Sequence, residues 1–211
     1  MTSIVSICNL ALGSIGKDAI SSIDEASAEA RACKTFYSIC LDTALQAYPW
    51  SWAEETRALA EVTNTRLNRW LYAYQRPVDC LKVRALLDES LMTEQPAGAG
   101  IVAGVHNRAI SGQVIFCDLK PAYLSFTKTF TDAAMFPPLF ADALGMSLAT
   151  RIAMPVTRDM KIRNDALTLS RQAMAMAQEA DSAEMTYDYD HPSERIEARG
   201  SDYAMRRPAI V

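Results

Sequence analysis

The chain has 211 residues, of which 50% are hydrophobic and 22% charged, and its formal net charge is −4. This length accommodates one substantial domain, or a domain with an inserted subdomain, and the hydrophobic share is enough for a real core. The acidic balance argues against a dedicated nucleic-acid-binding protein, which usually carries a basic face.

Five cysteines without a Cys-x-x-Cys pair, together with two histidines, predict neither a zinc site nor a disulfide framework. We therefore expect no metal and no cofactor, and a reduced protein. No basic N-terminus leads into an apolar run, and no run reaches the ~18 residues of a membrane span. We expect synthesis in the cytoplasm and no membrane association.

The first predicted helix ends at the glycine-rich stretch LALGSIGKD, residues 10–18. Its apolar residues follow a helical spacing: Ile4, Ile7, Cys8, Ala11 and Ile15. A phosphate-binding Walker A loop needs four residues between its glycines and a Ser or Thr after its lysine. Here two residues separate Gly13 from Gly16, and Asp18 follows Lys17. We predict that Gly16 ends the helix in a left-handed cap and turns the chain towards a second helix.

The second helix is predicted to begin near Ser22, where SIDE matches a capping box, or slightly later at Ser27. Its apolar residues recur every three or four positions until Pro49 stops it: Ala30, Cys33, Tyr37, Cys40, Ala44 and Tyr48. We expect the two helices to form an antiparallel pair, with Cys33 and Cys40 on a shared buried face as small hydrophobes.

After Pro49 the apolar period changes to two, which predicts strands. The alternating positions are Trp50 and Trp52, then Trp70, Tyr72 and Tyr74, then Leu81, Val83, Ala85 and Leu87. Pro77 excludes a central strand position between them. Residues 88–112 are rich in glycine and predict a flexible loop flanking a short strand. Residues 113–117 and 123–129 predict a hairpin that turns at residues 119–121.

Helix returns at Pro137-Pro138 and is predicted to continue to about Met154, where Pro155 breaks it. Thr157 is a plausible cap for a last helix to about Met185. That helix is rich in Ala and Met, a surface that is usually packed core and sometimes a binding groove.

Residues 186–211 show no sustained periodicity but carry more apolar anchors than a solvating tail needs, which is typical of a segment that orders on a partner. The candidate partner-binding residues are Tyr187, Tyr189, Ile196, Tyr203, Arg206, Arg207, Ile210 and Val211.

The elements together predict an α+β protein. Residues 1–48 and 132–185 form a mainly α-helical bundle, residues 49–131 form an inserted β-rich subdomain, and residues 186–211 form an extended C-terminal tail that orders on partner binding.

Enzymatic interpretations are weak. Cys80 or Cys117 would need His106 or His191 as a partner, but the histidines lie in a glycine-rich loop and in the tail, where nothing local holds an imidazole. Three pairs of adjacent acids resemble the carboxylates of a glycoside hydrolase but are more typical of solvated surface: Asp24-Glu25, Glu54-Glu55 and Asp88-Glu89. No nucleophile elbow, dinucleotide fingerprint or His-Glu-x-x-His motif is present, so no catalytic residue is predicted.

Basic residues lie near the aromatic positions of the predicted sheet: Arg57, Arg66, Arg69 and Arg76. Such a set resembles an aromatic-basic patch for nucleic acid. The alternation of Trp70, Tyr72 and Tyr74 instead favours core strand residues.

The opening segment, residues 7–53, resembles the start of the tail tubular protein A-like head-to-tail adaptors of short-tailed bacteriophages. The matching positions are Asn9, Leu12, Ile15, Gly16, Ser22, Ile23, Asp24, Trp50 and Trp52. A later segment, WLYAYQRPVDCLKV, resembles the Tyr-x-Tyr-x-x-Pro-x-Asp-Cys-Leu segment of that family, at Tyr72, Tyr74, Pro77, Asp79, Cys80 and Leu81. FPPLFADALGMSLATRIA resembles the helix after the family's sheet, and the resemblance covers about residues 3–185.

The resemblance implies a structural virion protein without shared catalytic residues, located in the neck or tail of the virion after synthesis in the host cytoplasm. Such adaptors form a ring, commonly twelve-fold, below the portal protein. The ring extends the channel for genomic DNA, without specific DNA binding, and provides the surface on which the tail nozzle or tail tube protein assembles. C-terminal tails of the ring subunits typically dock onto the portal. Two alternatives stay open, a virion-associated peptidoglycan hydrolase and a DNA-binding accessory protein.

Overall fold

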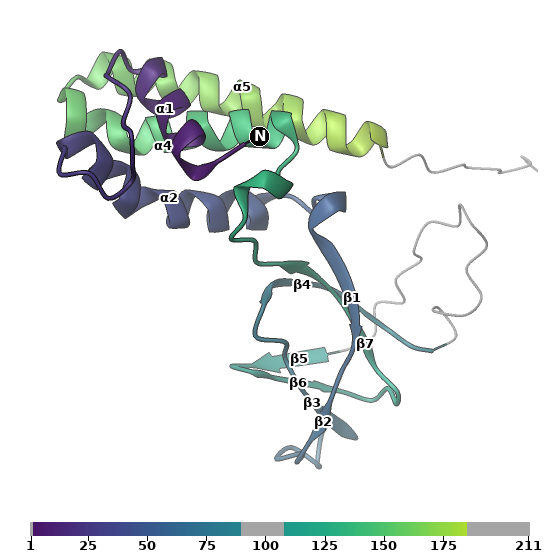
Figure 1. The fold of residues 1–211 in the computed structure, drawn as a ribbon. Helices are drawn as coiled ribbons and strands as arrows, with labels where there is room; N and C mark the ends of the chain where they lie inside the picture. Colours follow the sequence, from purple (N-terminus) through teal and green to yellow (C-terminus); the bar gives the residue numbers. More distant parts are fainter. Residues whose placement is uncertain (1, 90–107, 185–211) are drawn as a thin grey trace, which may run out of the picture.

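The computed structural model describes residues 2–89 and 108–184, and it has the predicted α+β architecture (Figure 1). Four α-helices form the bundle: α1 (Ile4–Ser14), α2 (Ala28–Ala47), α4 (Pro138–Thr157) and α5 (Met160–Glu184). The strands lie together on one side of this bundle, below the helices in Figure 1. The chain enters them after α2 and returns from them before α4.

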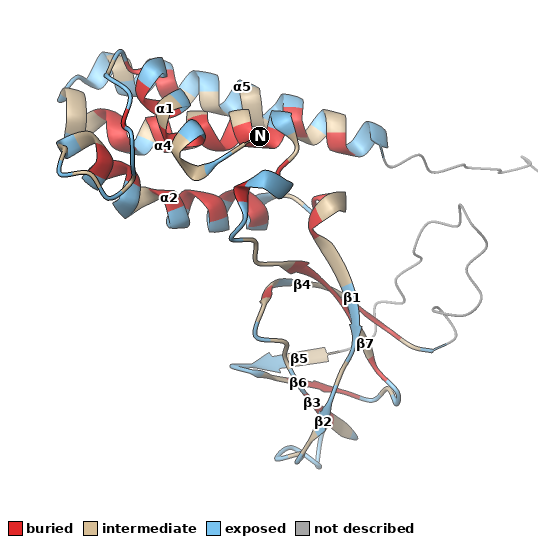
Figure 2. Cartoon of the chain, viewed as in Figure 1, coloured by how far each residue is buried: buried red, intermediate tan, exposed pale blue. Residues whose placement is uncertain are grey.

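Helix α4 is the centre of the bundle, because α1, α2 and α5 all pack against it. It is the one helix among the described residues whose length and apolar composition would suit a membrane span. Its burial between three helices accounts for that composition, as expected of a core helix. Figure 2 shows the buried residues gathered on the inward faces of α1, α2 and α4. Helices α1 and α2, which the sequence predicts as an antiparallel pair, make most of their contacts with α4 and few with each other.

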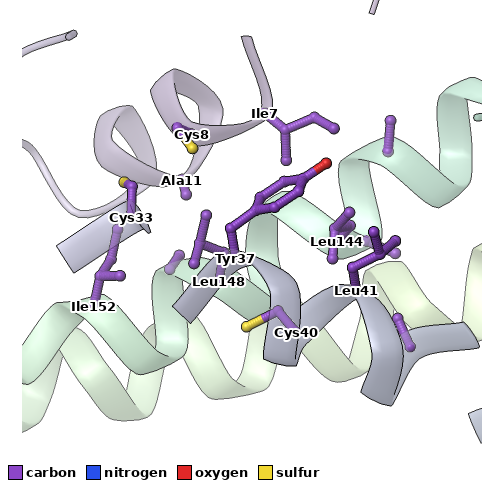
Figure 3. Packing of buried hydrophobic residues seen from close by; sticks show 14 of the residues in the cluster. Ile7, Cys8, Ala11, Cys33, Tyr37, Cys40, Leu41, Leu144, Leu148 and Ile152 are labelled. Atoms are coloured by element: carbon purple, nitrogen blue, oxygen red, sulfur yellow. The ribbon is translucent and has the colours of Figure 1, made fainter. Parts of the chain in front are cut away.

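The core between these helices contains three cysteines, Cys8, Cys33 and Cys40, and one buried tyrosine (Figure 3). Cys33 and Cys40 are almost fully buried, which confirms their predicted role as small hydrophobes. The five cysteines are free thiols. Tyr37 is buried without a partner for its hydroxyl among the described residues, and burial raises its pKa to about 12.

The glycine-rich stretch of residues 10–18 ends α1 and does not form a phosphate loop. Gly16 has a φ of +71°, as predicted. The Lys17 N–H donates to the Leu12 carbonyl at 3.0 Å and the Gly16 N–H to the Gly13 carbonyl at 3.1 Å, which is the Schellman pattern. The Asn9 side chain braces the following loop, since it donates to the Ile20 carbonyl at 3.0 Å and accepts from the Ile20 N–H at 2.8 Å.

Helix α2 begins after Ser27, the second of the two predicted starts. The Ser27 hydroxyl accepts a hydrogen bond from the Ala30 N–H at 3.1 Å and caps the helix. The predicted capping box at Ser22 is absent, because Glu25 instead accepts from the Ser21 N–H at 2.9 Å in a turn before the helix.

The strands form two antiparallel sheets. The first sheet has the order β1 (Glu54–Ala58), β7 (Tyr123–Lys128), β4 (Cys80–Leu87). The second has the order β2 (Glu61–Val62), β3 (Tyr72–Gln75), β6 (Val114–Cys117), β5 (Arg108–Ser111). A small second core lies between them and includes Tyr74, Leu86, Ile115, Leu124 and Phe126.

Three predictions for the strands are wrong in detail. Residues 113–117 and 123–129 do not form a hairpin, because β6 pairs with β3 and β5 while β7 pairs with β1 and β4. Trp50 and Trp52 lie at a short 3-10 helix (Ser51–Ala53), not in a strand. The register of β4 shifts twice, so Leu86 and Leu87 are both buried and the predicted alternation fails.

Pro155 does not break the helix as predicted. Helix α4 continues through it to Thr157, where Arg158 takes a φ of +55° and ends the helix. Pro155 removes one main-chain hydrogen bond, the one to the Arg151 carbonyl, and only two residues of the helix follow it, so the helix tolerates it. Thr157 is therefore the last residue of α4, and Asp159 accepts from the Lys161 N–H at 2.7 Å at the start of α5.

Replacing Gly16 by alanine tests the cap of α1. A side chain at a φ of +71° is strained, so Gly16→Ala is expected to lower the free energy of unfolding by about 1–2 kcal/mol. Gly13→Ala is the matched control, because Gly13 lies inside α1 with open space where the added methyl group would lie, and it should raise stability by roughly 0.5–1 kcal/mol. Urea unfolding of both variants measures the difference, and equal effects would contradict the assigned cap.

Candidate functional site

The eight predicted partner-binding residues all lie outside the described residues, between 186 and 211. They are Tyr187, Tyr189, Ile196, Tyr203, Arg206, Arg207, Ile210 and Val211. The described part of the chain offers four other features: the acid pairs, the cysteines, the basic residues of the sheet, and the surfaces of the bundle.

The adjacent acids Glu54 and Glu55 are both engaged in ion pairs. Glu54 lies 2.9 Å from the Arg84 guanidinium and also accepts from the Ser125 hydroxyl. Glu55 pairs with Lys128 at 2.9 Å and with Arg57, and these partners lower its pKa, Lys128 most. Because neighbours in a strand point to opposite faces, the two carboxylates do not converge on one substrate.

The other acid pairs are also engaged. Asp24 lies 2.6 Å from the Lys34 ammonium, and a hydrogen bond from the Ser21 main chain lowers the pKa of Glu25. Asp88 and Glu89 have interaction partners as well. Asp24 and Glu25 therefore stabilise the turn before α2.

The candidate nucleophiles Cys80 and Cys117 are buried in the small core between the sheets. Burial raises the pKa of the Cys117 thiol, which favours its unreactive protonated form. Their proposed partners, His106 and His191, lie outside the described residues. Within residues 2–89 and 108–184, no three His, Cys, Asp or Glu side chains are grouped to hold a metal ion.

The basic residues of the sheet do not form one patch. Arg57 pairs with Asp79 at 3.0 Å and with Glu55, and Arg76 donates to the Cys80 carbonyl at 2.7 Å. Trp70 and Tyr74 are buried, so their ring faces are not platforms on which bases could stack.

The two remaining arginines, Arg66 and Arg69, lie in a segment at residues 63–71 that is mostly exposed, although it includes the buried Trp70. Leu67 and Leu71 are 74% and 63% exposed there. Asn64 braces this segment, since its side chain donates to the Trp70 carbonyl at 2.6 Å and accepts from the Arg66 N–H at 2.8 Å. A braced segment with exposed leucines is a candidate contact surface. The sequence did not reveal this surface, because the period of two at Trp70, Tyr72 and Tyr74 predicts a strand there.

A polar network joins the bundle to the first sheet. Asp181 of α5, only 6% exposed, accepts from the Ser51 N–H at 3.0 Å and from the Ser51 hydroxyl at 2.7 Å. Arg84 of β4 donates to the Trp50 carbonyl at 2.6 Å and to the Thr127 hydroxyl at 2.9 Å. The half-buried Arg84 is also attracted to Asp181, so three distant segments meet here.

A groove of about 480 Å³ runs between α2 and α5, with α4 as its floor. Phe36, Ala44 and Met174 supply apolar lining, while Arg151 and Arg163 supply positive charge. The Cys40 thiol also lines it, and burial raises the pKa of this thiol to about 11 against the opposing effect of the Arg151 guanidinium. In the sequence, the alanine and methionine content of the last helix indicated a possible groove along α5, but not the residues of α2 and α4 that complete it.

No protein-family model matches the chain, and no curated protein matches it.

Removing the Asp181 carboxylate tests the network at the junction. Asp181→Ala should lower the free energy of unfolding by about 2–3 kcal/mol, because it leaves the Ser51 N–H without its acceptor and removes a charge opposite Arg84. Asp165→Ala is the control on the same helix, since Asp165 is exposed and its removal should cost about 0.5 kcal/mol or less. Thermal and urea unfolding provide the comparison, and similar losses for both variants would contradict a structural role of the network.

Proposed function

We propose that the chain is a head-to-tail adaptor of a short-tailed bacteriophage, a structural virion protein without catalytic activity. Its copies form a ring below the portal protein, extend the DNA channel and provide the attachment surface for the tail nozzle or tail tube protein. The observation that carries this proposal is that the residues of the family resemblance occupy structural positions at the turns and junctions of the fold.

The first group of these residues builds the connection between α1 and α2. Asn9 fixes the loop at Ile20 through two hydrogen bonds, and Gly16 provides the left-handed cap. Asp24 pairs with Lys34 of α2. A resemblance restricted to surface residues could arise by chance, whereas these residues determine how the chain turns, which supports a shared fold.

The second group lies at the junction of the bundle with the sheets and within the sheets. The Trp50 indole N–H donates to the Ala44 carbonyl at 2.9 Å, and the Tyr74 hydroxyl donates to the Leu119 carbonyl at 2.7 Å. Asp79 pairs with Arg57 across the first sheet. Each of these three matched side chains therefore has a specific partner.

The charge and surfaces of the chain also suit a connector. A net charge of −4 disfavours adhesion of DNA phosphates, so the genome can slide through a lumen. The exposed segment 63–71 and the groove between α2 and α5 are two separate surfaces for neighbours in an assembly. The hydrolase alternative has less support, because Glu54 and Glu55 are engaged in ion pairs.

Mixing the purified protein with portal rings tests the connector function. Electron microscopy should show an added ring at one face of the portal. Deletion of residues 186–211 should leave a folded, soluble protein that no longer binds the portal, because the tail provides the apolar anchors. Absence of a ring with the full chain would refute the connector proposal. Full retained binding by the truncated chain would refute only the assignment of the tail.

Duplex DNA binding tests the accessory-protein alternative. A connector whose lumen passes the genome should show no saturable affinity for duplex DNA at physiological salt. Fluorescence anisotropy with a labelled duplex over a salt series measures this. A salt-dependent Kd tighter than about 1 μM, below the usual range of non-specific binding, would favour the accessory protein instead.

A further inference from the structure

The groove between α2 and α5 has the chemistry of a site for an acidic, aromatic peptide. Arg151 and Arg163 make no ion pair with any residue that the structure describes, although both line the groove. The apolar surface between them and the far end of the groove comes from Phe36, Ala44 and Met174. Unpaired guanidinium groups next to apolar surface favour carboxylates carried by a peptide with aromatic side chains.

One segment of this chain outside the described residues has the complementary composition. Residues 185–194, MTYDYDHPSE, contain Tyr187 and Tyr189 alternating with Asp188 and Asp190, followed by Glu194, and no lysine or arginine. An extended chain places alternate side chains on opposite sides. The two tyrosines can therefore face Phe36 and Ala44 on the α2 side of the groove, while the two aspartates face the side that carries Arg151 of α4 and Arg163 of α5.

The reach of this segment disfavours the groove of its own chain for its two aspartates. Helix α5 ends at Glu184, and the 21 residues from Arg163 to Glu184 span about 31 Å of helix. Asp190 is six residues beyond Glu184, so a fully extended return would carry it back at most about 22 Å.

Arg151 lies at the same end of the groove as Arg163. The Ser147 and Ser170 hydroxyls are 3.0 Å apart, which fixes the alignment of the antiparallel helices α4 and α5. Arg151 is one turn beyond Ser147 towards the start of α5, and hence about 27 Å from the level of Glu184. With both side chains fully stretched, the aspartates of the same chain reach these arginines only if no residue is used to reverse the chain direction after Glu184. The segment of a neighbouring copy has no such constraint.

We propose that this groove binds residues 185–194 of a neighbouring copy of the chain. The contact rests on the ring assembly proposed above and identifies one of its subunit interfaces. Asp188 and Asp190 of the neighbour pair with Arg151 and Arg163, and its tyrosines cover the apolar lining. Of the eight candidate partner-binding residues, Tyr187 and Tyr189 then bind the neighbouring copy, and the six from Ile196 onward remain available for the portal.

A labelled peptide of residues 185–194, added to the full-length protein, tests this contact even where the protein is monomeric. Fluorescence anisotropy should show saturable binding. The variant R151E/R163E should weaken it at least about tenfold, because each pair becomes repulsive. The control K161E/R171E changes the net charge equally on exposed residues of α5 that do not line the groove, and it should leave the affinity within about twofold.

A D188N/D190N peptide tests the role of the aspartates. It should bind the unchanged protein at least about tenfold more weakly than the original peptide does. Absence of saturable binding, or equal weakening by both charge variants, would overturn the proposal. Unchanged circular dichroism and melting of both variants exclude unfolding as the cause of any loss.

Photo-crosslinking distinguishes whether the groove binds the segment of a neighbouring copy or the segment of the same chain. Benzoylphenylalanine at position 189 in a mixture of isotopically light and heavy full-length chains, with portal rings present, should yield light-heavy crosslinks to peptides containing Cys40 or Met174. Crosslinks confined to one chain would overturn docking between neighbours. A ring on the portal without groove binding would refute this contact alone, and groove binding without any ring would refute the connector proposal.

Discussion

The fold depends on the aromatic contact at which the bundle meets the sheets. The Trp50 ring packs edge-on against Phe140 of α4 at a centroid distance of 5.0 Å, and Trp52 packs against Phe140 at 4.9 Å and against Phe130 at 5.2 Å. Trp50 and Trp52 precede the first strand, and Phe130 follows the last one. Both ends of the β-rich segment are therefore anchored in the core of the bundle, and each aromatic pair adds about 0.5–1.5 kcal/mol beyond its buried area.

The polar network around Arg84 fixes the orientation of the first sheet at this aromatic contact. Aromatic packing alone allows sliding, whereas hydrogen bonds from Arg84 to the Trp50 carbonyl and from Ser51 to Asp181 fix the first sheet against α2 and α5. Asp181 lies in the last turn of α5, where a negative charge is unfavourable to the helix dipole. Its presence there is explained by the partners that it holds, and these contacts fix the first sheet against the bundle.

The sequence predicts the helices well, because their 3.6-residue period repeats over many residues and their ends carry local signals such as Gly16 and Ser27. The strands are harder, since β1 pairs with β7 and β3 with β6 across long stretches of chain, and no local pattern encodes those partners. Trp50 and Trp52 are two residues apart because both side chains pack in the core of the bundle, and not because they belong to a strand. The groove and the Asp181 network combine residues from three distant segments, so only the folded chain reveals them.

The two complementary surfaces of the proposed contact determine which kind of assembly it can build. The basic end of the groove and the acidic segment 185–194 lie on different parts of one chain, so a contact between them joins unlike surfaces of successive copies. Such a head-to-tail contact repeats until rotation closes it into a ring, whereas a contact between like surfaces stops at a dimer. Closure requires the same rotation at every step. In the proposed ring, the junction of Trp50, Arg84 and Asp181 fixes the sheet against the bundle in every copy, and the segment beyond Glu184 supplies the proposed contact.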